Sequence, residues 1–192
     1  MKIVGVGCGP GMLTMAALCE IRCAKTIYGS GRAIELIKDY IPEYCDVHEI
    51  EDYGNLKEIS DDSILLSTGD PMLAGLGSLN GEVVPGISSM QVAFARLKIR
   101  MTDSIIINAH GKDHVKAIND TIEELGRGRN VFLIADPGFN VKMIANSLIK
   151  YYPDVSISVC EELGYDTERI TTGTPHSPPE NRSDLFAIVI RK

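Results

Sequence analysis

Apolar residues follow two alternating patterns along the chain. Continuous apolar runs, typical of buried strands, occupy residues 1–6, 26–28, 64–66, 83–84, 104–108, 130–134, 155–160 and 185–190. Between them, residues 13–24, 32–40, 92–97, 115–125 and 136–152 place apolar side chains three and four positions apart, which predicts amphipathic helices. Strands that alternate with helices predict an α/β fold.

The strand and helix patterns restart after residue 100, so we expect two α/β domains, residues 1–100 and 101–192. Thr14 and Ser30 are candidate N-caps of the first two helices. The acidic stretch 46–62 contains few apolar residues and is expected to be a solvated connector that carries a short helix. Gly126 is expected in a surface turn.

Three strands run into loops of small residues. Residues 4–11 read Val-Gly-Val-Gly-Cys-Gly-Pro-Gly, Gly69-Asp70-Pro71 follows the strand at 64–66, and residues 85–89 read Pro-Gly-Ile-Ser-Ser. Small molecules bind outside the carboxyl ends of strands in open α/β sheets, and glycine lets the main chain approach them closely. The loops therefore predict a ligand site. The alternative for the second loop is a plain strand-to-helix turn in which Asp70 caps the helix.

The first loop does not fit the dinucleotide fingerprint Gly-x-Gly-x-x-Gly. Counted from Gly5, the third glycine falls on Pro10, and counted from Gly7 it falls on Met12. The second strand also ends at Gly29 without an acidic residue for a ribose. The sequence therefore argues against a nicotinamide or flavin site.

Composition narrows the class of protein. The 192 residues are 44% hydrophobic and 23% charged, as in an ordinary globular protein, and the net charge of −7 with a pI near 5.1 argues against a nucleic-acid partner. No apolar run approaches the roughly 18 residues of a membrane span, and the chain enters a strand after one lysine, so we expect a cytoplasmic protein without a signal peptide.

The five cysteines are scattered without a Cys-x-x-Cys motif and are expected to be free thiols. Cys19 and Cys23 lie four residues apart on a predicted helix. Packing explains this pair better than metal binding, so no metal site is predicted.

The order of the three loops resembles the tetrapyrrole methylases. This resemblance implies an S-adenosylmethionine-dependent enzyme with two α/β domains and the cofactor in the cleft between them. It also implies a homodimer and a small tetrapyrrole substrate. It covers about residues 1–190.

The second half of the chain resembles the subgroup that methylates carbon 5 of cobalt-precorrin-7 in cobalamin biosynthesis. The similar segments are residues 108–112, 134–137 and 160–165, followed by Glu168-Arg169. The subgroup commonly has His-Gly-Arg where this chain has a lysine at 112, and Gly-Glu-Arg-Leu-Gly where it has Cys-Glu-Glu-Leu-Gly at 160–164. The first exchange keeps a cation, whereas the second replaces a cation with a carboxylate. Some relatives carry a fused carbon-15 methyltransferase that decarboxylates a ring acetate. This chain is too short to hold it, so we expect a separate protein for those steps.

The resemblance also implies the residues of the site. Asp70 is the candidate to pair with the ammonium of the cofactor, and His110 is the favoured acid/base residue. The expected cofactor contacts are Gly9, Pro10, Gly69, Asp70, Pro71, Leu73, Ile87, Ser88, Ser89, Ala135 and Cys160. A substrate with many carboxylates needs cations, for which the candidates are Arg32, Arg96, Arg100, His110, Lys112 and His114.

Two other functions stay open from the sequence. One is a methylase of the same fold that acts on another precorrin ring carbon or on a protein histidine derivative. The other is a non-catalytic module that binds a tetrapyrrole or a nucleotide.

Overall fold

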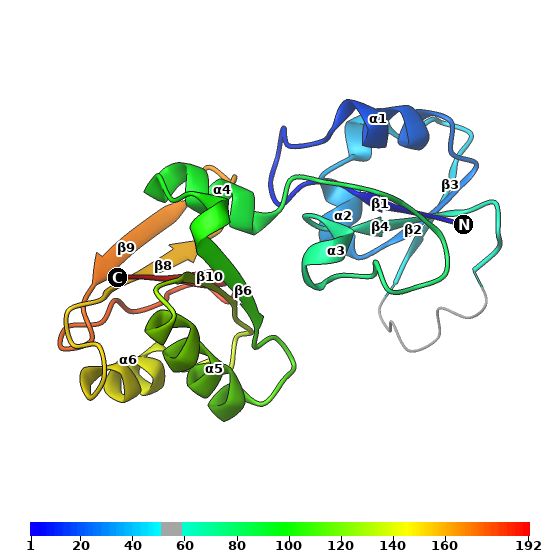
Figure 1. Ribbon diagram of the computed structural model, residues 1–192. Helices are drawn as coiled ribbons and strands as arrows, with labels where there is room; N and C mark the ends of the chain where they lie inside the picture. The colour runs from blue at the N-terminus through cyan, green and yellow to red at the C-terminus, as the bar shows by residue number, and fades with distance from the viewer. Residues whose placement is uncertain (51–58) are drawn as a thin grey trace. The chain divides into compact units, whose positions relative to one another are not determined.

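The computed structural model describes residues 1–50 and 59–192. The chain divides into two compact units, Met1–Ser89 and Met90–Lys192, and each unit has its own sheet and helices (Figure 1). The predicted α/β fold is confirmed. The division falls at helix α4 (Ser89–Leu97), whereas the sequence pattern placed it between residues 100 and 101. Helix α4 contacts the second sheet, because the Phe94 and Phe132 rings meet edge to face with centroids 5.8 Å apart.

The sheet of the first unit is parallel throughout, with strand order β3-β2-β4-β1-β5. Its strands are β1 (Lys2–Gly5), β2 (Thr26–Gly29), β3 (Asp46–Glu49), β4 (Ile64–Ser67) and β5 (Glu82–Val84). Because the strands are parallel, their carboxyl ends share one edge. The loops that follow β1, β4 and β5 therefore lie at the same edge of the sheet.

Side-chain caps begin the helices of the first unit. The helical elements are α1 (Met15–Arg22), α2 (Gly31–Glu35), the 3₁₀ turn η1 (Lys38–Tyr40) and α3 (Pro71–Ala74). The predicted N-caps are confirmed, since Thr14 Oγ1 and Ser30 Oγ accept hydrogen bonds from backbone N–H groups of α1 and α2. Helix α2 ends earlier than the predicted range 32–40, and Tyr40, at the end of that range, is 40% exposed.

Strand β3 corrects the prediction of a connector at 46–62. Residues 46–49 pair with β2 at the edge of the sheet, with Val47 opposite Ile27. All four side chains are exposed. A polar edge strand contacts only one neighbour and needs no apolar run. The helix predicted in the rest of this stretch falls on residues 51–58, which lie outside the described residues.

The sheet of the second unit is mixed, with strand order β6-β7-β10-β8-β9. Its strands are β6 (Ser104–Asn108), β7 (Asn130–Ile134), β8 (Ser156–Glu161), β9 (Arg169–Gly173) and β10 (Phe186–Arg191). Strands β6 and β7 are parallel, and β10 is antiparallel to both β7 and β8. The carboxyl ends of β6, β7 and β8 therefore share one edge with the start of β10. Strand β9, which the sequence analysis did not predict, pairs with β8 at the other margin.

Helices α5 (His114–Gly126) and α6 (Val141–Ile149) pack on the same side of this sheet, and a short 3₁₀ turn, η3 (Met101–Asp103), precedes β6 (Figure 1). Gly126 is the last residue of α5, which corrects its assignment to a surface turn. Helix α6 begins after its Asn140 cap and not at residue 136. Among the described residues, no helix is long and apolar enough to cross a membrane.

Candidate functional site

Three glycines from three strand ends pack backbone against backbone in the first unit. A Cβ atom added to Gly5 would lie 2.6 Å from the Gly86 nitrogen and 2.8 Å from the Gly69 carbonyl oxygen. A Cβ atom on Gly86 would overlap that same oxygen. Only glycine permits this spacing at Gly5 and Gly86. The loops after β1, β4 and β5 therefore form one continuous backbone surface at the carboxyl edge.

Gly69 and Gly7 join two of these loops by a backbone bridge. The Gly69 N–H donates to the Gly7 carbonyl across 2.8 Å, and the Gly7 N–H donates to the Gly69 carbonyl across 3.3 Å. Both residues have positive φ angles, 81° at Gly7 and 70° at Gly69. Gly9 and Pro10, which were predicted as cofactor contacts, are not part of this bridge. Those two follow in the same loop, where the Gly9 carbonyl accepts from Met12 N–H.

The space beside Gly69 is open. If a Cβ atom were added to Gly69, one heavy atom of the described residues, Ser88 Cα, would lie within 4 Å of it, at 3.9 Å, apart from atoms of the adjoining residues. The backbone of Gly69 thus faces the Ile-Ser-Ser segment without a side chain between them. This is the feature of the first unit that best suits a bound small molecule.

Asp70 holds the second and third loops together. Its Oδ1 accepts from Met72 N–H at 2.7 Å and caps α3, while its Oδ2 accepts from Gly86 N–H at 3.1 Å. The helix-cap reading of Asp70 therefore holds in the geometry. Since both oxygens are engaged by backbone donors, the main contribution of Asp70 is to fix the loops, and Asp70 is less suited to the predicted pairing with an ammonium group.

Other side chains of the first unit reach the same loops. The Arg32 guanidinium donates to Thr68 Oγ1 at 3.0 Å, one residue before Gly69, and Thr14 Oγ1 donates to the Pro85 carbonyl at 3.4 Å. The predicted contacts around them differ in exposure. Gly9, Gly69, Pro71 and Ser88 are buried, Asp70, Leu73, Ile87 and Ser89 are half-buried, and Pro10 is exposed.

In the second unit, Asp136 holds the loops at the carboxyl ends of β6 and β7 together, as Asp70 does for two loops of the first unit. Its Oδ2 accepts from Gly111 N–H at 2.9 Å and contacts His114 Nε2 at 3.0 Å, while its Oδ1 accepts from Gly138 N–H at 2.9 Å. The Gly111 N–H, followed by the His114 contact, lowers the pKa of the Asp136 carboxyl below its usual value. Asp136 is thus an ionised anchor for the loop that carries His110.

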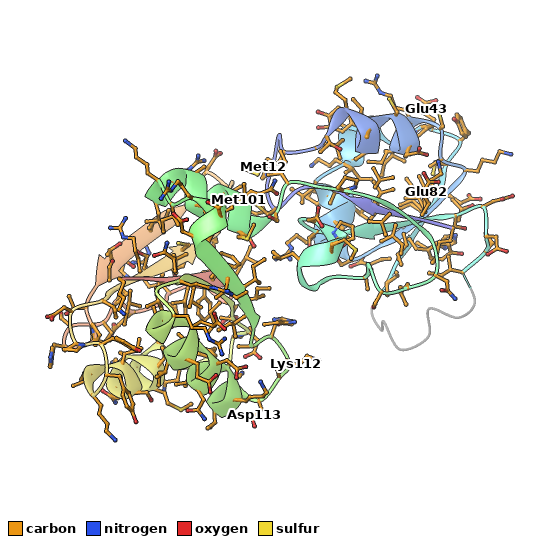
Figure 2. All side chains as sticks on the ribbon, in the orientation of Figure 1. Met12, Glu43, Glu82, Met101, Lys112 and Asp113 are labelled. Carbon is orange, nitrogen blue, oxygen red and sulfur yellow. The ribbon has the colours of Figure 1, made fainter. Side chains whose placement is uncertain are left out.

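The predicted residues His110 and Ala135 meet at this edge, because His110 Nδ1 lies 3.3 Å from the Ala135 carbonyl oxygen. Lys112 extends outward from the same loop, and Asp113 beside it caps the start of α5 (Figure 2). Cys160 has no exposed surface. Burial, with the nearby Glu168 and Glu161 carboxylates, raises the pKa of its thiol to about 12. Its side chain is therefore an inert part of the core.

Glu161 and Glu168, in the segment that begins at Cys160, make ion pairs and hydrogen bonds within the second unit. Glu161, only 2% exposed, pairs with the Arg169 guanidinium and accepts from the N–H groups of Arg182 and Ser183. Glu168 accepts from Gly164 N–H at 2.8 Å. These contacts fix the turn after β8 and the segment that leads into β10.

Arg96 and Arg100, two of the predicted substrate cations, each pair with a carboxylate of the chain. Arg96 Nε lies 2.6 Å from Glu168 Oε1, and this interaction is the largest cause of a lowered Glu168 pKa. Arg100 Nη2 lies 2.6 Å from Asp103 Oδ2. Arg32 and the histidines of the 110–114 loop are better placed for a ligand, because they lie at the carboxyl edges of the two sheets.

Sequence reasoning missed the backbone bridge between Gly7 and Gly69, the hydrogen bond from Gly86 N–H to Asp70, and the pairing of His114 with Asp136. The glycines at 5 and 7 were visible as a glycine-rich loop, but their partners at 69 and 86 follow only from the strand order. The second Asp-Pro pair, Asp136-Pro137, repeats the Asp70-Pro71 pair and was the available signal for a second loop anchor.

Comparison with known proteins agrees with this geometry. The family described as Tetrapyrrole (Corrin/Porphyrin) Methylases matches residues 2–177. The chain is 33% identical to the probable cobalt-precorrin-7 C(5)-methyltransferase of Methanocaldococcus jannaschii over 86% of both chains. It is 28% identical to the decarboxylating precorrin-6Y C(5,15)-methyltransferase of Mycobacterium tuberculosis, over 98% of this chain but 51% of that protein.

A solved structure shares the fold along the whole chain. The cobalamin biosynthesis precorrin-6Y methylase of Archaeoglobus fulgidus superimposes with a TM-score of 0.77 and 28% identity, covering 100% of this chain and 97% of that one. The family match, the relatives and the loop geometry agree. The chain is a methyltransferase that belongs to the tetrapyrrole methylase family.

Proposed function

We propose that this protein transfers a methyl group from S-adenosylmethionine to carbon 5 of cobalt-precorrin-7 in cobalamin biosynthesis. The observation that carries the proposal is the glycine-lined surface at residues 5, 69 and 86, in a chain 33% identical to a probable enzyme of that activity. A methylase for another ring carbon is the runner-up.

The loops fit a methyl donor with an adenosine and an amino-acid end. Such a molecule needs backbone groups that approach closely and space that no side chain fills, and the surroundings of Gly69 and Ser88 supply both. Asp70 would keep these loops in register and contribute to binding through their geometry. We propose that Ile87, Ser88 and Ser89 line one side of the cofactor.

A sulfonium donor supplies an already activated methyl group, so the protein mainly has to position the two reactants. Holding the reacting carbons about 3–3.5 Å apart and in line can contribute on the order of 7–11 kcal/mol to lowering the barrier. The rigid bridges between Gly7 and Gly69 and between Asp70 and Gly86 suit this task, because they fix the loops before any ligand binds.

A substrate rich in acetate and propionate groups needs cations at the mouth of the site. Arg32 is the best candidate in the first unit, since its hydrogen bond to Thr68 holds the guanidinium next to the Gly69 loop. Arginine binds carboxylates through two parallel hydrogen bonds. Lys112 and the histidines at 110 and 114 are the candidates in the second unit.

Binding and transfer can be tested separately. Calorimetry with S-adenosylmethionine should give saturable binding with a stoichiometry near one per chain. Labelled donor should then transfer its methyl to cobalt-precorrin-7 but not to a protein histidine acceptor. Binding without transfer to cobalt-precorrin-7 would keep the family assignment and reject the proposed substrate.

A further inference from the structure

Two histidines lie in one loop and helix start of the second unit, and they differ in their partners. His110 Nδ1 faces a neutral carbonyl oxygen, that of Ala135, at 3.3 Å. His114 Nε2 faces the Asp136 carboxylate at 3.0 Å. A positive charge on an imidazole is stabilised much more by a carboxylate than by a carbonyl group. The two rings therefore differ in the charge of the group that orients them, a neutral carbonyl for His110 and a carboxylate for His114.

The His114 ring is oriented as well as paired. The ring packs against the Phe139 ring with centroids 5.0 Å apart. His114 is also the first residue of α5, and the Asp113 side chain caps this helix. The ring is still reachable, since its side chain is 26% exposed. Asp136, which is 18% exposed, is in turn held by the N–H groups of Gly111 and Gly138.

We propose that His114 accepts the proton that the tetrapyrrole loses during methyl transfer, with Asp136 as its positioning residue. This inference rests on the proposed function. When neutral, the imidazole donates its Nε2–H to Asp136 and presents Nδ1 as the acceptor. The carboxylate partner of the ring is Asp136, and the other titratable or charged residues within four positions of His114 along the chain are His110, Lys112, Asp113 and Lys116.

The proton balance of the reaction requires such an acceptor. Two π electrons of the ring carbon form the new bond to the methyl group, and the methyl–sulfur bond breaks with its electron pair staying on sulfur. The positive charge of the sulfonium thus passes to the tetrapyrrole, which becomes neutral again by losing the proton of the methylated carbon. That proton moves to His114 Nδ1, and the imidazolium beside Asp136 later releases it to solvent.

The experiment compares His114→Gln with His110→Gln, with Asp136→Asn and with the control H176Q, whose residue is exposed in the 174–179 segment. Glutamine at 114 keeps an amide N–H for Asp136, so the loop anchor survives. We expect His114→Gln to bind S-adenosylmethionine like the wild type but to transfer methyl roughly 10²–10⁴-fold more slowly in single turnover. Its rate should lose the pH dependence typical of a histidine between about pH 5 and 8.

Asp136→Asn should show a smaller loss of rate, because His114 keeps its imidazole but loses the carboxylate that orients it. A second readout does not depend on activity. Nitrogen NMR of the wild type should show the Nε2–H tautomer of His114, and Asp136→Asn should disturb it. Unchanged rate and pH profile in His114→Gln, with an active wild type, would overturn this inference alone. A wild type that transfers no methyl would overturn the proposed function and this inference with it.

Discussion

The Asp70 carboxylate accepts a hydrogen bond from the backbone N–H of Gly86 at 3.1 Å and so ties together the loops that follow β4 and β5. The same carboxylate caps α3 through Met72 N–H. One side chain therefore sets both the start of a helix and the spacing of two loops that form the candidate site. This double role yields the first prediction.

Asp70→Ala should weaken binding of S-adenosylmethionine by releasing the Gly86 loop, and should lower the free energy of unfolding by about 1 kcal/mol through the lost cap. Calorimetry and urea unfolding measure the two effects. Asn140→Ala is the matched control, because Asn140 caps α6 in the same way through Lys142 and Met143 N–H. Equal loss of cofactor affinity in both variants would remove Asp70 from the site.

Gly69→Ala tests whether the open space beside Gly69 holds the ligand. Gly128→Ala is the control, since Gly128 has a φ of 80° and no heavy atom of the described residues within 4 Å of the added Cβ, much like Gly69 with a φ of 70°. Both variants should lose roughly 1–2 kcal/mol of stability because a left-handed backbone disfavours a side chain. Only Gly69→Ala should lose affinity for S-adenosylmethionine in calorimetry. Similar affinities in the two variants would show that the space is not used for binding.

Gly86→Ala should be more destabilising than Gly69→Ala, because its Cβ would overlap the Gly69 carbonyl and displace the backbone of a neighbouring loop. Forced overpacking of this kind costs about 1–3 kcal/mol, in addition to any effect on binding. Urea unfolding curves of the two variants give the comparison. A Gly86→Ala protein as stable as the wild type would mean that the three loops move apart easily.

The contacts around Gly69 and Gly86 also show which features can be predicted from the sequence and which cannot. The strand at 64–66 and the caps Thr14 and Ser30 were predicted because the signals are local: an apolar run, or a hydroxyl before a helix. The hydrogen bond from Gly86 N–H to Asp70 was not predicted, because it joins residues that only the order of β4, β1 and β5 brings together. Edge strands β3, with four exposed residues, and β9, with mostly half-buried ones, were missed because an edge strand needs no continuous apolar run.

The Asp136 anchor should make stability depend on pH. Its lowered pKa in the folded state means that folding favours the ionised carboxyl. Its contribution is therefore present above the unfolded pKa, near 3.9, and is lost as the pH falls through the folded value. The difference in urea midpoint between wild type and Asp136→Asn should be largest near pH 7 and shrink below about pH 4. A difference that stayed constant across this range would show that ionisation of Asp136 adds nothing to stability.

The identity and number of the transferred methyl groups test the central claim most directly. Incubating this chain with cobalt-precorrin-7 and carbon-labelled S-adenosylmethionine should add one methyl without loss of carbon dioxide in mass spectrometry, and carbon NMR should place the label at carbon 5. The mycobacterial relative is named a C(5,15) decarboxylating enzyme, and this chain spans 51% of it. A label at another ring carbon, or a product that has lost carbon dioxide, would contradict the account.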